Sequence, residues 1–155
     1  MKVQPASFSP FLFYTPSSMP PLFVYGTLLF PEILATLLNR VPHHIESTLI
    51  DHRRFAIHDG PKVRPYPAIF PEPGAVVSGH LLPDLSPREC QILDAYEGAD
   101  YAKTTGQVKK AGQWTEAEVY IWRADKRGQL RDSWEPEYFQ AHHLGTYLRY
   151  LALVA

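Results

Sequence analysis

Apolar residues recur along the chain with two different periods, and together they predict both strands and helices. An apolar, β-rich run at 22–25 ends at Gly26, as is typical of a buried strand. From Pro31 onward the apolar residues recur at i, i+3 and i+4, which predicts a helix with one buried stripe that ends before Pro42. The chain after its first twenty residues should therefore form a strand followed closely by a helix.

The middle of the chain is predicted to be extended. The segment 45–57 favours a strand, and Asp59-Gly60 predicts the turn after it. Residues 61–73 are dense in proline. Because proline cannot donate to a central ladder, Tyr66–Phe70 is predicted as an edge strand or an ordered loop. A further strand is expected over 75–82.

The clearest helix start lies at Ser86-Pro87. Ser86 suits the N-cap, Pro87 the first helical position and Glu89 the third, and together they form a capping box. Gly98 suits the left-handed position that ends a helix. We therefore expect a helix between these residues.

Two strands and a closing helix complete the pattern. Strands are expected over 103–109 and 116–123, the second with one apolar and one aromatic-polar face. A helix from about Pro136 would carry one apolar stripe, made of Leu144, Tyr147, Leu148, Leu151 and Val154. Five or six strands and about three helices that do not strictly alternate predict an α+β fold, a small mixed β-barrel flanked by helices.

Composition divides the 155 residues into a tail and one domain. Residues 1–19 are rich in proline and serine and are predicted to be disordered or weakly ordered, and 20–155 is long enough for a single domain. No charge occurs over 3–31, but its longest apolar runs are four residues, too short for a membrane span or a signal peptide. We expect a cytoplasmic protein with no membrane partner.

Charge and cysteine usage exclude further classes of protein. A net charge of −1 is no basis for binding nucleic acid. The single cysteine, Cys90, excludes an internal disulfide and is interpreted as a buried thiol, with a reactive thiol as the alternative. His43-His44 and His142-His143 are adjacent pairs rather than ligands at i and i+4, so no metal site is expected.

The strand-to-helix turn at Tyr25–Phe30 is the first candidate site. A glycine turn that leads into a helix N-terminus presents several backbone N–H groups to one point, where a carboxylate or phosphate can bind. No Gly-Lys-Ser/Thr follows, so the turn is not a nucleotide P-loop. The alternative is a turn that holds Gly26 for steric reasons alone.

Glu97 is the second candidate. If Gly98 ends the helix, the Glu97 carboxylate lies at the negative end of the helix dipole, which raises its pKa, and more so if the site is buried. A carboxylate with a raised pKa can act as a general base. The alternative is a surface glutamate ahead of a helix-ending glycine.

Four segments, in this order, closely resemble the γ-glutamylcyclotransferase-like superfamily, nearest to its plant avirulence-induced-gene-like (AIG-like) branch. They are Val24–Leu28, Tyr66–Ile69, Val77–Leu81 and Leu93–Tyr101, and the resemblance covers roughly 21–123. It implies a small β-barrel flanked by helices and an acyltransferase that cyclises a γ-glutamyl group to 5-oxoproline. The substrate is then a small γ-glutamyl compound, and no cofactor is needed.

The resemblance also assigns roles to residues. Glu97 would be the proton acceptor, and Tyr101 would line the pocket. The γ-glutamyl group would be cradled by backbone amides of the turn, which comprises Tyr25, Gly26, Thr27 and Leu28 and extends through Leu29 and Phe30. The alternative is a non-catalytic module of the same fold that binds a metabolite or a protein in a stress or defence response. The leaving group stays open at this point.

Overall fold

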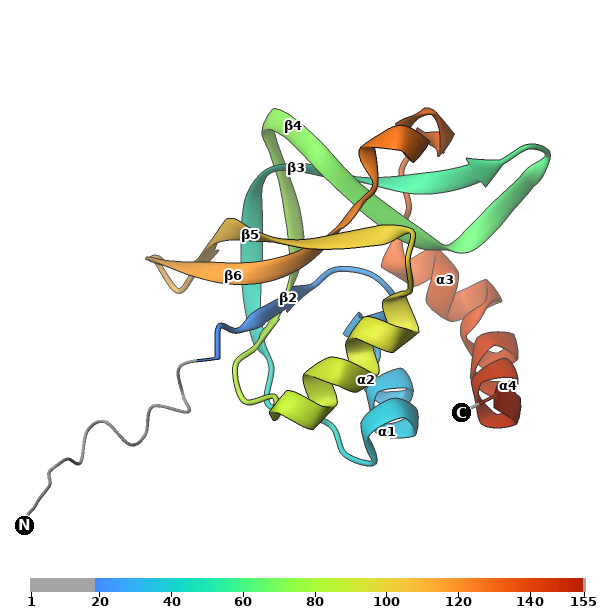
Figure 1. Cartoon of the computed structure of the whole chain (residues 1–155). Helices are drawn as coiled ribbons and strands as arrows, with labels where there is room; N and C mark the ends of the chain where they lie inside the picture. Colours follow the sequence, from blue (N-terminus) through green and yellow to red (C-terminus); the bar gives the residue numbers. More distant parts are fainter. Residues whose placement is uncertain (1–18, 155) are drawn as a thin grey trace, which may run out of the picture.

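Five strands close into a barrel in the computed structural model, which describes residues 19–154 (Figure 1). Around the barrel they follow the order β4 (Lys62–Leu82), β2 (Leu22–Val24), β6 (Gln113–Trp122), β5 (Tyr101–Lys110), β3 (Ile45–Asp59), and β3 pairs back to β4. Because β2 runs parallel to β6 and the other pairs are antiparallel, the barrel is mixed, as predicted. Nearly all of the expected tail at 1–19 lies outside the described residues.

The α-helices gather along one side of this barrel (Figure 1). They are α1 (Pro31–Leu38), α2 (Pro87–Glu97), α3 (Pro136–His142) and α4 (Leu144–Val154). Of the 3-10 helices, η3 (Thr27–Leu29) leads from β2 into α1, whereas η4 (Ala124–Gln129) lies apart from the α-helices, next to β3. A two-residue strand, β7 (Leu130–Arg131), follows η4 and pairs with β3 outside the barrel. Among residues 19–154, no helix combines the length and apolar character needed to cross a bilayer.

The proline-dense segment forms the first half of the long strand β4. It pairs with β3, where Pro71 lies opposite His52 and Pro67 opposite Ala56. On its other side β4 meets β2 only near its end, where Leu82 lies opposite Leu22. The prolines therefore lie where the strand has one partner, as the edge-strand alternative requires.

The predicted capping box starts α2. Ser86 accepts a hydrogen bond from the Glu89 amide, and the Glu89 side chain accepts one from the Ser86 amide. Gly98 follows the helix with a φ of 81°, a conformation that glycine adopts without strain. Local sequence thus determined both ends of the helix that carries Glu97.

The single closing helix expected from Pro136 is wrong, because the helix breaks at His143 into α3 and α4. Phe139 and Leu144 are both buried in the same core. In one straight helix, the rotation about the axis from Phe139 to Leu144, five residues later, would be about 500°. These two side chains would then lie on different faces of the helix. The break allows both helices to pack against the same cluster.

The barrel interior is filled by aliphatic and aromatic side chains. Gly79 on β4 allows the barrel to close tightly, because a Cβ there would lie 2.2 Å from the Val24 carbonyl oxygen and 2.7 Å from the Phe23 ring. A second core lies between the barrel and the helices. The interior cluster consists of Phe23, Tyr25, Leu49, Ile69, Val77, Leu81, Val108, Ala117 and Val119.

Candidate active site

A cavity of about 960 Å³ lies between the end of β2, the end of α2 and one face of α4. It brings together six of the eight residues predicted for a site, although they come from three separate segments. These six are Tyr25, Gly26, Thr27, Leu28, Glu97 and Tyr101.

The structure places Leu29 and Phe30 away from this cavity, which corrects the longer extent of the expected cradle. Leu29 borders a separate surface hollow. Phe30 is buried in the core under the helices, where its ring centroid lies 5.2 Å from that of Phe139. The chain makes a single 3-10 turn from Thr27, and this turn carries it from the cavity to the start of α1.

The turn leaves backbone donors free beside the cavity. The amides of Leu29 and Phe30 donate to the carbonyls of Gly26 and Thr27, which close the 3-10 turn. Within residues 19–154, no acceptor takes the amides of Thr27 and Leu28, as is general for the first residues of a helix. Two unpaired N–H groups beside a cavity suit a carboxylate or a developing oxyanion.

Two contacts hold the start of this turn. The Arg54 guanidinium donates a hydrogen bond of 2.9 Å to the Tyr25 carbonyl oxygen. Gly26 packs so closely on the Pro67 ring that a Cβ would lie 2.8 Å from its Cγ atom. Gly26 is therefore required for steric reasons. This requirement is compatible with a role of its backbone in binding.

Glu97 is the last residue of α2, and its side chain lines the cavity. Burial raises the pKa of its carboxyl to about 8, and the nearby Asp94 carboxylate adds to this effect. Sequence reasoning attributed the raised pKa chiefly to the helix dipole, whereas desolvation by the surrounding protein is the largest cause. No hydrogen bond from the described residues reaches the Glu97 carboxylate, so it is free to exchange a proton with a bound molecule.

Asp94 is held in place one turn before Glu97. The Tyr120 hydroxyl donates to Asp94 Oδ1 at 2.5 Å, and the Lys103 ammonium donates to the same oxygen at 3.0 Å. These two donors fix the position of the Asp94 carboxylate, which adds to the rise in the pKa of Glu97.

A chain of hydroxyl groups ties the turn to α2 and α4. The hydroxyls of Thr27 and Tyr96 lie 2.7 Å apart, and those of Tyr96 and Tyr147 also lie 2.7 Å apart. Sequence reasoning missed Tyr96 and Tyr147 as site residues, because Tyr147 was interpreted as part of an apolar stripe. Adjacency to Glu97 was the only local signal for Tyr96.

Two further tyrosines shape the cavity through their hydroxyls. Tyr101 donates to the Pro67 carbonyl oxygen at 2.7 Å, and Tyr25 donates to the Tyr120 carbonyl oxygen at 2.6 Å. Burial raises the pKa of both phenols well above the ordinary value. Both therefore stay protonated and keep these hydrogen bonds at neutral pH.

The other candidate groups do not join the cavity. Cys90 packs partly buried against the helical core, and burial raises the pKa of its thiol, which favours the unreactive protonated form. Within the described part of the chain, no three His, Cys, Asp or Glu side chains come together as metal ligands.

The fold and the cavity define a class of protein: a closed five-stranded mixed barrel, flanked by helices, with a cavity lined both by a carboxyl of raised pKa and by the turn at the start of η3. Residues 22–140 match the family model described as gamma-glutamyl cyclotransferase, AIG2-like, and the chain belongs to this family.

Individual relatives agree with this assignment. AIG2-like protein C of Arabidopsis thaliana is 33% identical over 123 residues, which cover 78% of this chain and 69% of that protein. A solution structure of an Arabidopsis thaliana protein has a TM-score of 0.64 and 25% identity, and covers 84% of this chain and 87% of that one. A structure named gamma-glutamyl cyclotransferase shares the fold, with a TM-score of 0.57 and 16% identity over 85% of each chain.

Proposed function

We propose that the protein cyclises a γ-glutamyl group to 5-oxoproline and releases an amine or amino acid, with Glu97 as the general base. The observation that carries this proposal is a carboxyl with a pKa of about 8, unpaired within the described residues, in the cavity that the turn at Tyr25–Leu28 lines. Family membership supports it, since the matching family is described as gamma-glutamyl cyclotransferase, AIG2-like.

The chemistry needs few groups because both reacting centres belong to the substrate. The α-amine attacks the γ-carbonyl carbon, a C–N bond forms, and the original amide C–N bond breaks. Holding the substrate folded supplies part of the ~7–11 kcal/mol available from proximity. An α-ammonium cannot attack, so a base must first take its proton.

Glu97 suits this proton transfer. With a pKa of about 8, Glu97 is a much stronger base than an ordinary glutamate at ~4.3, and its pKa is closer to that of an α-ammonium. The proton can pass to Glu97 at little cost and then to the nitrogen of the departing amine. The free amides of Thr27 and Leu28 would bind the substrate α-carboxylate or the oxygen of the tetrahedral intermediate.

The test is release of 5-oxoproline from a panel of γ-glutamyl dipeptides and γ-glutamylamines. Glu97→Gln should lower kcat by at least ~10² because the base is lost. Glu116→Gln, an exposed glutamate on β6, is the matched control and should retain full activity. A Glu97→Gln variant as active as the parent would overturn the assignment. Binding of γ-glutamyl compounds by the parent without ring closure would favour the non-catalytic module.

A further inference from the structure

The cavity extends well beyond what a γ-glutamyl group needs. Its volume of about 960 Å³ lies near the top of the range of roughly 300–1,000 Å³ that holds drug-sized ligands. The proposed chemistry uses only the end with the turn and Glu97. The remaining volume must therefore receive the part of the substrate that departs.

The wall of that remaining volume is apolar and aromatic. On α4, the positions Tyr147, Tyr150, Leu151 and Val154 follow i, i+3, i+4 and i+7 spacing, and all four line the cavity. Leu37 from α1 and Ile92 from α2 also line it. We call these six residues the apolar wall.

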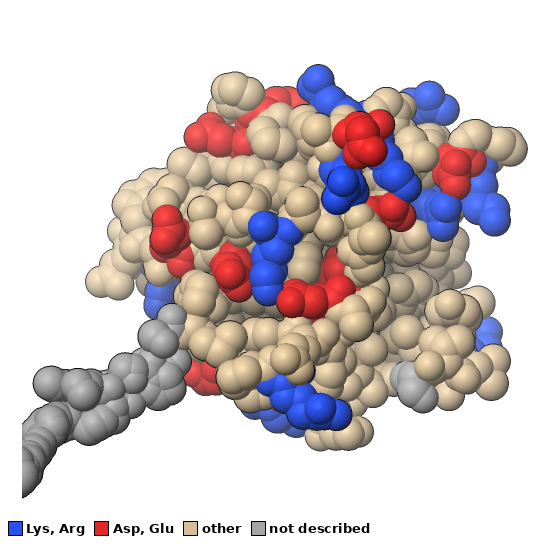
Figure 2. Space-filling model, in the orientation of Figure 1, with Lys and Arg blue, Asp and Glu red and all other residues tan. Residues whose placement is uncertain are grey.

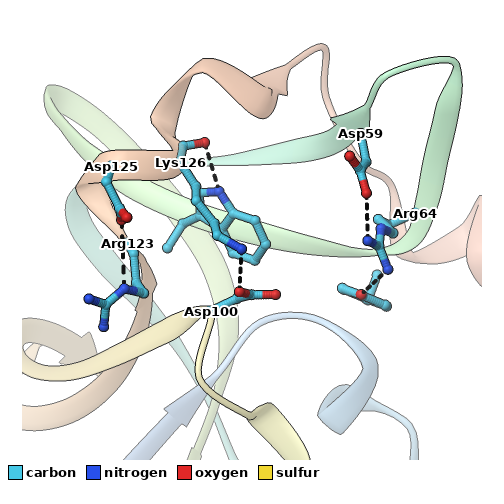
Figure 3. A network of polar contacts seen from close by, with 8 residues as sticks. Asp59, Arg64, Asp100, Arg123, Asp125 and Lys126 are labelled. Carbon is cyan, nitrogen blue, oxygen red and sulfur yellow. Dashed lines mark hydrogen bonds and ion pairs between the residues drawn. The ribbon is translucent and has the colours of Figure 1, made fainter.

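Apart from Glu97, the acidic and basic side chains described at the cavity, Arg64 and Asp100, are already paired. Arg64 lies 2.7 Å from the Asp59 carboxylate and also donates to the Tyr66 hydroxyl, and Lys126 donates to the Asp100 carboxylate (Figure 3). Arg64 is the only Lys or Arg lining the cavity among residues 19–154, so no unpaired lysine or arginine there would attract a second carboxylate. The surface over α4 in Figure 2 is likewise largely uncharged. Tyr150 and Val154 of this helix are exposed.

We propose that the apolar wall is the subsite for the leaving group and that it selects γ-glutamyl compounds whose leaving group is bulky and apolar or aromatic. This inference rests on the proposed function. A phenyl group on the leaving nitrogen would remove apolar surface of both partners from water. A charged side chain there would lose part of its hydration against apolar surface, which costs free energy. When the amide bond breaks, the released amine takes the proton held by Glu97.

Binding to Glu97→Gln tests the subsite without turnover. We expect calorimetry to give a Kd at least ~10-fold lower for γ-glutamyl-phenylalanine than for γ-glutamyl-glycine, the size of effect that a small apolar group makes in a matching pocket. The two ligands carry the same carboxylates, so the comparison isolates the side chain. Equal affinities, or tighter binding of γ-glutamyl-glutamate, would overturn the proposal.

A variant pair locates the selectivity on α4. Tyr150→Asp should abolish the preference for γ-glutamyl-phenylalanine over γ-glutamyl-glycine. Tyr138→Asp, at an equally exposed tyrosine on α3 outside the cavity, should keep the preference. A preference that survives Tyr150→Asp would count against the apolar wall. Selective binding by Glu97→Gln together with no 5-oxoproline from the parent would contradict the proposed function and leave the subsite supported.

Discussion

Replacing Glu97 by glutamine should make the protein more stable at alkaline pH while it removes the proposed base. The reason is that the folded state holds the Glu97 proton up to a pKa of about 8, whereas the ordinary value is 4.5. Below pH 4.5 the carboxyl is protonated in both states. As the pH rises toward 8, the unfolded chain loses this proton first, so the contribution of Glu97 to the free energy of unfolding falls, and above 8 it is constant.

The size of this loss follows from the two pKa values. At ~1.36 kcal/mol for each pH unit, the interval from 4.5 to about 8 corresponds to about 5 kcal/mol. About 4 kcal/mol of it falls between pH 5 and pH 9. Glutamine stays neutral and nearly isosteric, so the variant should lack this decline. Relative to the parent, it should gain up to about 4 kcal/mol from pH 5 to pH 9.

Urea unfolding at pH 5 and pH 9, followed by the fluorescence of the buried Trp122 and Trp134, measures the effect. Each protein gives a change in free energy of unfolding between the two pH values, and these changes are compared. Glu116→Gln is the control, and its change should match that of the parent. If the parent and Glu97→Gln lost the same stability between pH 5 and pH 9, burial of a neutral Glu97 carboxyl would be refuted.

Three further predictions follow from the same contacts. The kcat/KM for 5-oxoproline release should rise about tenfold per pH unit up to pH about 8 and then level off, because only ionised Glu97 accepts a proton. A flat profile between pH 6 and 8 would exclude Glu97 as the base. Arg54→Met should raise KM by about tenfold, since the charged hydrogen bond from Arg54 to the Tyr25 carbonyl is worth ~1.5–3 kcal/mol. Arg54→Lys should recover part of this loss. An unchanged KM would show that the turn holds its shape without the Arg54 hydrogen bond. Gly79→Ala should lower the free energy of unfolding, measured in urea, by at least ~1–3 kcal/mol, because the alanine methyl group would overlap the Val24 carbonyl oxygen. An unchanged free energy of unfolding would mean that β2 and β4 can move apart without cost.

Local signals in the sequence predicted the elements that carry the site. The capping box at Ser86 and Glu89 depends on neighbours three residues apart, so it can be identified without the fold. The apolar run that ends at Gly26 marked the strand and the turn for the same reason. The break at His143 escaped prediction because it depends on how two helices share one core, which no local pattern records.

The sequence by itself determined where the turn begins and where the helix carrying Glu97 begins and ends, and its resemblance to a family assigned a role to each. Only the tertiary structure decided that Glu97 is surrounded closely enough to raise its pKa to about 8, because desolvation comes from side chains distant in the chain. Tertiary packing also decided the link from Thr27 to Tyr96 to Tyr147, whose members lie 69 and 51 residues apart. It likewise placed α4 along the cavity, where Tyr147, Tyr150, Leu151 and Val154 line it.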